Sequence, residues 1–214
     1  MEGLRPIKMP SAKEKVAVEL RQAILSKHMK EGEVLSLETV ASQLNVSATP
    51  VREAFQILAR DGLIELRRNK GAVVLGISEN YIREHYELRA ILESSCARMA
   101  SSEGIDLQEI ENAYAISCET VSSGNLDHYS DLNRSFHHEI WVAAGNSRIA
   151  SLVSDLWNGL SLGNMVSEQD YAKVSLKEHG EILQAMRSHD GEKAFSEMYA
   201  HILRSRDDML TYYT

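Results

Sequence analysis

The chain has 214 residues, of which 43% are hydrophobic and 25% are charged, and it contains only 3 prolines and 12 glycines. This composition is typical of a soluble, helix-rich protein and excludes disordered and fibrous classes. A chain of this length predicts a small domain joined to a medium one. No stretch approaches the roughly 18 apolar residues that a membrane span requires, so we expect a cytoplasmic protein without membrane contact.

The net charge of −8 is distributed unevenly along the chain. Residues 1–77 hold 12 Lys and Arg against 9 Asp and Glu, a net charge of +3, whereas residues 78–214 hold 11 against 22, a net charge of −11. A basic domain joined to an acidic one can face nucleic acid with one end only. We therefore expect two domains, 1–77 and 78–214, with the first as the nucleic-acid-binding one.

Apolar residues at helical spacing predict three helices in the first domain, followed by a hairpin. Asn45 can adopt the left-handed conformation that a sharp turn between the second and third helices needs. The expected elements are a helix ending near Lys27-His28, a helix over Leu37–Leu44, a helix from Ser47 to about Arg60, and strands over Leu63–Leu66 and Ala72–Leu75 joined by a basic turn.

The third helix has the pattern of a DNA-reading element. Ser47 and Thr49 are candidate caps and, with Pro50 at the helix start, candidate phosphate contacts, because unpaired N–H groups there attract anions. Arg52 and Gln56 lie on the polar face, where Arg52 can reach a guanine edge or a phosphate and Gln56 an adenine. An exposed basic helix is also common as a plain solvated surface, so the pattern alone does not decide.

The hairpin tip adds a second candidate DNA contact. Arg68 and Lys70 can enter the adjacent minor groove, with Gly71 allowing the turn to approach closely. The run Val46-Ser47-Ala48-Thr49-Pro50-Val51-Arg52-Glu53-Ala54, with Leu58, Gly62-Leu63-Ile64 and Gly71, resembles the signature of the GntR family of bacterial regulators. The resemblance implies a winged helix-turn-helix domain that binds double-stranded DNA as a homodimer at a pseudo-palindromic operator. Ala48 departs from the arginine usual in the family, which removes one expected DNA contact.

The second domain shows helical periods that are interrupted by turn signals. The interruptions fall at Gly104, at Gly124, at Gly145-Asn146 and at His189-Asp190-Gly191. Between them the sequence predicts about six helices, enough for a bundle. The expected fold class is therefore mainly α, with a winged helix-turn-helix followed by an all-α bundle.

Three histidines in this domain are candidate metal ligands. His137, His179 and His201 fall on three different predicted helices, and Asn133 shares a helical face with His137 because the two are four residues apart. Spacing alone equally fits buried histidines that are hydrogen-bonded in the core. The segments Leu132-Asn133-x-x-Phe136-His137, Gly145-Asn146, Glu178-His179 and His201 resemble the FadR-like sensor domain known as FCD. That resemblance implies a divalent metal, Zn first and Ni or Mn as alternatives, bound by Asn133, His137, His179 and His201.

An anionic effector follows from this ligand set. Neutral ligands leave the site positively charged, and Arg89 lies in a segment that resembles the family's effector-contacting helix, where it can pair with a carboxylate. A core salt bridge of Arg89 is the competing interpretation. We therefore expect a transcription repressor, not an enzyme, that responds to a small organic acid. The alternatives are a metal-dependent hydrolase and a regulator whose metal is purely structural.

Overall fold

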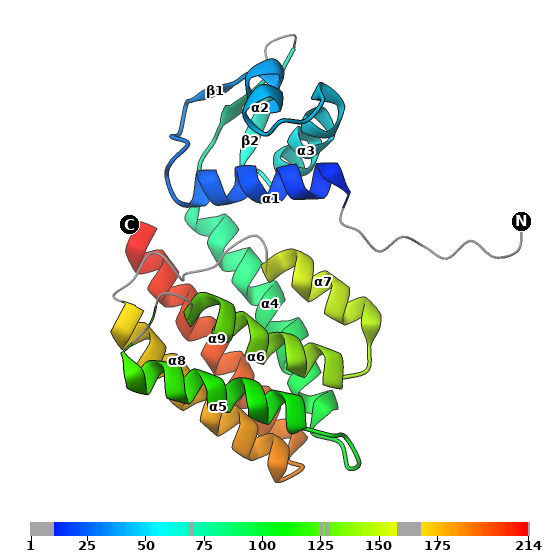
Figure 1. Cartoon of the computed structure of the whole chain (residues 1–214), viewed down its shortest axis with the longest axis vertical. Helices are drawn as coiled ribbons and strands as arrows, with labels where there is room; N and C mark the ends of the chain where they lie inside the picture. Colours follow the sequence, from blue (N-terminus) through cyan, green and yellow to red (C-terminus); the bar gives the residue numbers. More distant parts are fainter. Residues whose placement is uncertain (1–10, 69–70, 125, 127–128, 158–167, 214) are drawn as a thin grey trace, which may run out of the picture. The chain divides into compact units, whose positions relative to one another are not determined.

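The computed structural model describes residues 11–68, 71–124, 126, 129–157 and 168–213. The chain divides between Ile77 and Ser78 into two compact units, which are described separately (Figure 1). Within the described residues, no helix has the length and apolar character needed to cross a membrane.

The first unit combines three helices with a small antiparallel sheet. In chain order its elements are α1 (Ala12–Leu25), β1 (Val34–Leu35), α2 (Leu37–Gln43), α3 (Ala48–Arg60), β2 (Ile64–Arg67) and β3 (Gly71–Val74). The sheet order is β1-β3-β2, with Val34 opposite Val73 and Leu66 opposite Ala72. β1 was not predicted, because two residues are too short to show an alternating pattern.

Local backbone chemistry sets the helix ends of this unit. α1 ends earlier than predicted because Lys27 adopts φ = 57°, which cannot continue a helix. The side chain of Ser36 accepts a hydrogen bond from the Thr39 amide and caps α2. Asn45 has φ = 52°, as the sequence predicted, so the chain turns sharply from α2 into α3. The apolar face of α3 is buried and fixes the helix against the unit's core: Val51, Ala54, Phe55 and Leu58.

The second unit is a helical bundle. Its described helices are α4 (Glu79–Ala100), α5 (Gln108–Ser123), α6 (Tyr129–Ala143), α7 (Ser147–Trp157), α8 (Glu168–Arg187) and α9 (Gly191–Tyr213). Gly104, Gly124, Gly145 and His189 all have positive φ at the predicted interruptions. The predicted fold class, a winged helix-turn-helix followed by an all-α bundle, is confirmed.

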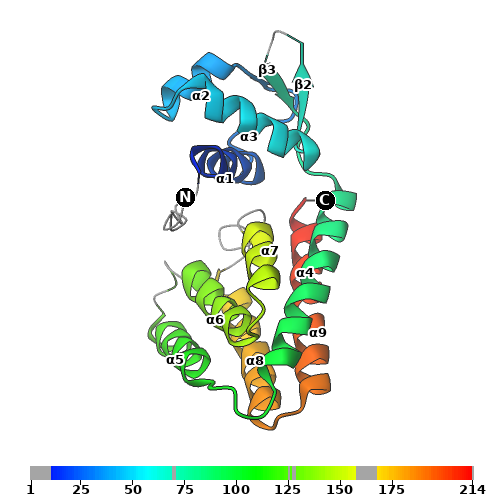
Figure 2. The ribbon, with the colours of Figure 1, turned by 90° about the vertical axis from the view of Figure 1, so that its right-hand side faces the viewer.

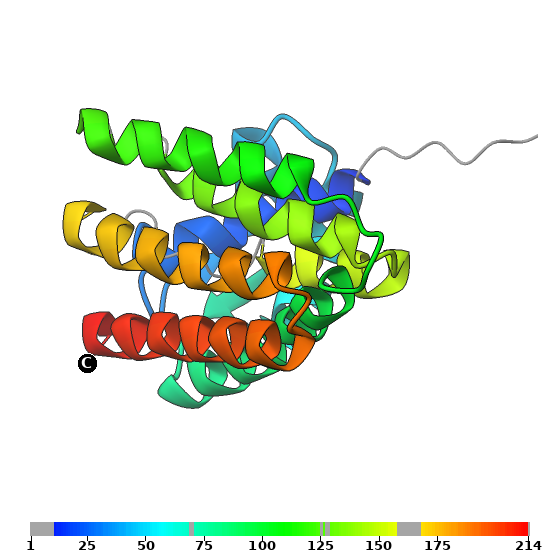
Figure 3. The same cartoon turned by 90° about the horizontal axis from the view of Figure 1, so that it is seen from below.

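Packing in the bundle places one face of each of several helices around a common core. α4 runs alongside α9 (Figure 2), and α8 packs between α9 and α5 (Figure 3). α6 contacts α4, α5 and α7. The core contains large apolar side chains from these faces, including Phe136, Ile140, Trp141 and Ile182, and several polar side chains lie among them. These buried polar groups form the candidate site.

Candidate functional site

Three fully buried histidines converge from three helices. His137 on α6, His179 on α8 and His201 on α9 are 0%, 1% and 2% exposed. Each offers a ring nitrogen, and these three nitrogens lie within 4.8 Å of one another. The structure thus brings together the three histidines that the sequence singled out.

The rings of His137 and His201 are each hydrogen-bonded to a carboxylate through Nδ1. Nδ1 of His137 lies 2.7 Å from Oε2 of Glu93, and Nδ1 of His201 lies 2.7 Å from Oε2 of Glu178. The opposite nitrogens, Nε2 of His137 and Nε2 of His201, are 3.2 Å apart. Two nitrogen ligands of a tetrahedral zinc ion, at Zn–N distances of about 2.05 Å, are separated by about 3.3 Å. The spacing of these two atoms therefore fits a metal between them.

Glu93 is buried completely and is surrounded by hydrogen-bond donors. Nε of Arg89 donates to its Oε1 at 2.8 Å, and Nε1 of Trp141 donates to its Oε2 at 3.2 Å. Burial alone would raise the pKa of Glu93, but Arg89 and His137 outweigh burial and lower that pKa to about 2. Glu93 is therefore an ionised carboxylate in the core of the bundle.

The carboxylate of Glu178 is also bonded to an arginine. Arg204 donates from Nε and Nη2 to both carboxylate oxygens of Glu178, at 2.8 to 3.0 Å, and it also bonds Asp208. The guanidinium lies over the ring of Tyr171. Burial raises the pKa of Glu178, whereas hydrogen bonds from His201 and Arg204 lower it, and the net shift is downward. Glu178 is thus also ionised.

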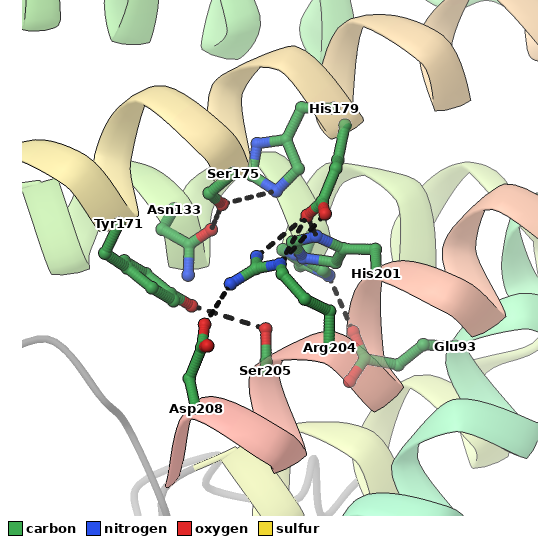
Figure 4. Close-up of polar contacts among 11 residues, drawn as sticks. Glu93, Asn133, Tyr171, Ser175, His179, His201, Arg204, Ser205 and Asp208 are labelled. Atoms are coloured by element: carbon green, nitrogen blue, oxygen red, sulfur yellow. Dashed lines mark hydrogen bonds and ion pairs between the residues drawn. The ribbon is translucent and has the colours of Figure 1, made fainter. Parts of the chain in front are cut away.

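His179 has a different environment. Its ring stacks on Phe136 with centroids 4.2 Å apart, and its Nε2 lies 3.4 Å from Oγ of Ser175. The same hydroxyl lies 3.4 Å from Oδ1 of Asn133, the predicted fourth ligand, which is 8% exposed (Figure 4). The hydroxyl of Ser175 therefore connects Asn133 to His179.

Burial keeps two of these imidazoles neutral. It lowers the pKa of His179 well below its usual value and, with the neighbouring His137, lowers that of His201 to about 4 although Glu178 opposes the shift. Neutral imidazole is the form that binds metals. Three imidazole nitrogens with an amide oxygen form a donor set that suits zinc and also other divalent transition metals. The residues present therefore fit a divalent metal.

Arg89 is paired within the core. It is 4% exposed, its Nε is bonded to Glu93, and its guanidinium carbon lies 4.2 Å from the ring centre of Trp157. The core salt bridge that the sequence left open is therefore present. A contact between Arg89 and an effector stays a prediction.

The predicted DNA-contacting residues of α3 lie at the surface of the first unit. Arg52, Gln56, Ser47 and Thr49 are exposed, and Pro50 is half-buried in the first turn, where its missing N–H is not needed. Ser47 occupies the N-cap position, but its side chain makes no capping hydrogen bond, so the predicted capping role of this hydroxyl is wrong. The amides and hydroxyls at this helix start remain candidate anion contacts.

The hairpin between β2 and β3 carries the remaining candidates. Arg68 is exposed directly after β2, whereas Lys70 lies outside the described residues. Gly71 has φ = 80°, and a Cβ at this position would lie 1.9 Å from the carbonyl oxygen of Leu35. The absence of a side chain at Gly71 is therefore required by the close approach of β1, independently of any DNA contact.

Several residues of the site were not anticipated from the sequence, namely Glu93, Trp157, Ser175, Glu178 and Arg204. The sequence did contain a signal for Glu93, which lies four residues after Arg89 and shares the buried face of α4 with Ala90, Ala97 and Ala100. Glu178 directly precedes His179, and nothing in that pattern indicates a bond to a histidine 23 residues further on.

Comparisons with known proteins agree with this architecture. The model of the family described as "Bacterial regulatory proteins, gntR family" matches residues 12–74, and the model of the FCD domain matches residues 84–204. The gluconate operon transcriptional repressor of Bacillus subtilis is 33% identical over 148 residues, which are 68% of this chain and 59% of the repressor, so the match spans less than two thirds of that relative. The Nta operon transcriptional regulator of Aminobacter aminovorans is 27% identical, over 87% of this chain and 89% of that protein.

Solved structures show the same fold. A protein from Rhodococcus sp. RHA1 assigned as a GntR transcriptional regulator is 26% identical with a TM-score of 0.67, covering 96% of this chain and 100% of that one. McbR/YncC of E. coli has a TM-score of 0.73 over the same shares at 19% identity, which supports the fold alone. The family resemblance of the sequence is confirmed: the chain belongs to the GntR family of bacterial regulatory proteins, with an FCD domain as its C-terminal unit.

Proposed function

We propose that the chain is a DNA-binding transcription repressor whose operator binding responds to a small organic acid at a metal site in the FCD unit. The observation that carries the sensor part is the convergence of the buried nitrogens of His137, His179 and His201 within 4.8 Å. Three imidazole nitrogens from three helices at this spacing form a typical ligand set for a divalent cation, so a bound cation is the simplest reason for the arrangement.

The DNA part of the proposal rests on the family and on the surface of α3. Arg52 and Gln56 are exposed on a helix whose opposite face is buried, which is the requirement for reading base edges in the major groove. Ser47, Thr49 and Pro50 would add contacts to the DNA phosphates around it, and Arg68, Lys70 and Gly71 at the hairpin tip would approach the adjacent minor groove. Two copies in a homodimer would read the two halves of a pseudo-palindromic operator.

The metal part assigns four ligands. His137, His179, His201 and Asn133 would hold the ion, with zinc as the first choice and nickel or manganese as alternatives. Because all four ligands are neutral, a bound divalent cation would retain its positive charge and attract a carboxylate oxygen of the effector. One relative is named for a gluconate operon, and gluconate is an organic acid of this kind.

Signal transfer would begin on α4. This helix starts at Glu79, directly after the first unit ends, and it carries both Arg89 and Glu93. A change around these two side chains on effector binding would therefore alter the helix that follows the DNA-binding unit in the chain. By linkage, the operator must change effector affinity by the same factor as the effector changes operator affinity.

Neither alternative function gains support. The family and the named relatives are transcription regulators, which weighs against a hydrolase. A purely structural metal is distinguished by experiment: removing a sensor metal abolishes the response to the acid and leaves the protein folded.

The decisive experiment is a selection of genomic DNA fragments by the purified protein in about 0.15 M salt, with and without chelator. We expect enrichment of a short palindrome beside an operon for an organic acid. Operator affinity is then measured with a panel of carboxylates on metal-loaded and metal-stripped protein. Enrichment of no sequence in either condition would contradict the DNA-binding proposal, and an unchanged response after stripping would contradict the sensor role of the metal.

A further inference from the structure

Two glutamates that are not in the proposed ligand set are hydrogen-bonded to two of the ligand histidines, in each case at Nδ1 and not at the Nε2 that would face the metal. Glu93 is bonded to Nδ1 of His137 and Glu178 to Nδ1 of His201, at the same distance of 2.7 Å. Each glutamate is bonded in turn to an arginine, Arg89 for Glu93 and Arg204 for Glu178. The site therefore contains two hydrogen-bonded triads, and in each of them an arginine is bonded to a glutamate that is bonded to a histidine.

These bonds determine which nitrogen of each ring carries the proton. Arg89 and Trp141 donate to the two oxygens of Glu93, and Arg204 donates to both oxygens of Glu178. Since both carboxylates act as acceptors in these bonds, Nδ1 of His137 and Nδ1 of His201 are the donors in theirs. A neutral imidazole has one N–H, and its other nitrogen then carries a lone pair. When both rings are in the neutral form that binds metals, their Nε2 atoms, 3.2 Å apart, direct lone pairs toward the same point. Two facing lone pairs repel each other unless a cation lies between them.

We propose that Glu93 and Glu178 are positioning residues for the metal: they fix the tautomer and the orientation of His137 and His201 so that both Nε2 atoms are ready to coordinate. This inference rests on the proposed metal site and extends it to residues that would not touch the ion. Carboxylates bonded to metal-ligating histidines raise metal affinity by about 10- to 100-fold in other sites. We expect effects of this size here.

The two glutamates differ in how firmly they are held. Glu93 is 0% exposed and accepts from Arg89, His137 and Trp141, so it has no freedom to reorient. The Glu178 side chain is 23% exposed and can be solvated in part. Loss of the charge at Glu93 should therefore weaken metal binding more than the same loss at Glu178.

His179 provides an internal contrast. Among the described residues, its ring is hydrogen-bonded to the hydroxyl of Ser175, at the long distance of 3.4 Å, and no carboxylate takes part. Its orientation depends on stacking against Phe136. The tautomer of His179 should therefore be unaffected by substitution of either glutamate.

The test compares Glu93→Gln and Glu178→Gln with matched controls on the same helices. Glu87→Gln on α4 and Glu181→Gln on α8 remove exposed carboxylates, the latter from a surface ion pair with Lys177. Metal-stripped full-length protein is titrated with Zn²⁺ against a chromophoric chelator, and Co²⁺ is added in parallel to record its visible absorption. The tautomers of the histidines are read by long-range ¹⁵N–¹H NMR in the stripped protein.

We expect Zn²⁺ affinity to fall about 10- to 100-fold in each of the two site variants and to change less than about twofold in the controls. The NMR spectrum should show Nδ1–H on His137 and His201 in the wild type and a mixture at His137 in Glu93→Gln. A merely structural role of the glutamates would lower the melting temperature and leave affinity, cobalt spectrum and tautomers unchanged.

The same measurements distinguish an error in the positioning role of the glutamates from an error in the proposed metal site. If the wild type binds Zn²⁺ and His201→Ala does not, but both glutamate variants bind like the wild type, the positioning role is wrong and the metal site stands. If the wild type does not bind Zn²⁺, Co²⁺, Ni²⁺ or Mn²⁺, both proposals are wrong. Should Glu93→Gln fail to fold, the partly exposed Glu178→Gln, together with the conservative Glu178→Asp, decides the question.

Discussion

The indole of Trp157 lies against the imidazole of His137, with ring centroids 4.8 Å apart. The guanidinium of Arg89 covers the same indole at 4.2 Å, and Trp141 bonds the glutamate behind His137. The sequence contains two tryptophans, so both lie at the candidate metal centre. Intrinsic fluorescence of this protein therefore reports on the site directly.

We predict that Ni²⁺ or Co²⁺ added to metal-stripped protein quenches tryptophan emission and that the change saturates at one ion per chain. Quenching falls off steeply with distance, and an ion bound by His137 would be close to both indoles because the His137 ring lies beside them. The measurement is a fluorescence titration. His201→Ala, which removes a proposed ligand and keeps both tryptophans, serves as the control and should abolish the change. Equal quenching in that variant would mean that the ions bind elsewhere.

A second prediction concerns Gly71. A methyl group there would lie 1.9 Å from the backbone oxygen of Leu35 and would also occupy a positive φ of 80°. We expect Gly71→Ala to cost more than about 3 kcal/mol in the free energy of unfolding, because β1 must separate from β3 to admit the methyl group. Urea denaturation measures this cost.

Gly62→Ala is the matched control for Gly71. It has nearly the same φ, 73°, and nothing lies within 4 Å of the position that its methyl group would occupy. Only backbone strain of about 1 kcal/mol should result. Equal costs at the two glycines would show that the approach of β1 is not what requires the glycine.

Most elements of the first unit could be predicted from local sequence patterns. The buried face of α3, the left-handed Asn45 and the positions of the hairpin strands follow from spacing and turn chemistry, and all were predicted to within a few residues. β1 could not be predicted, since its two residues form a strand only through pairing with β3. Such pairing depends on tertiary contact and leaves no periodic signal.

The candidate metal centre could not be predicted from the spacing of its residues alone. The spacing of Asn133 and His137 places them on one helical face, but the convergence of His179 and His201 on that face depends on how three helices pack. Family resemblance supplied this information, and spacing did not. Glu93 and Glu178 were missed because a helical glutamate is ordinarily a surface residue, and its burial becomes evident only when the arginine and histidine partners are placed around it.

A third prediction tests DNA recognition. Arg52→Ala should weaken operator binding by about 1–3 kcal/mol and relax the base preference at one position of each half-site, since a base contact carries sequence information. Arg68→Ala should weaken binding to nearly all sequences alike and reduce the salt dependence of the affinity by about one unit of slope, because an arginine at the hairpin tip neutralises phosphate charge beside the minor groove. Fluorescence anisotropy with operator and scrambled duplexes at several salt concentrations measures both effects.

The control for the DNA variants is Arg83→Ala on α4. Arg83 is an exposed arginine of the second unit that pairs with Glu79, and its loss should leave operator affinity unchanged. A uniform, sequence-independent loss in Arg52→Ala would assign this residue to the phosphate backbone and not to a base edge.

The last prediction concerns the buried pair of Arg89 and Glu93, whose side chains are 4% and 0% exposed. Arg89→Met leaves the Glu93 carboxylate buried without its main positive partner, and removing one member of a buried ion pair typically costs about 3–5 kcal/mol. The double variant Arg89→Met/Glu93→Gln removes both charges, so we expect it to unfold at a higher urea concentration than Arg89→Met alone. In the exposed pair of Arg83 and Glu79, Arg83→Met should change stability by less than about 1 kcal/mol. If the double variant is as unstable as the sum of its single variants, the two charges are not coupled, and Arg89 must stabilise the bundle mainly through its contacts with Trp157 and Tyr86.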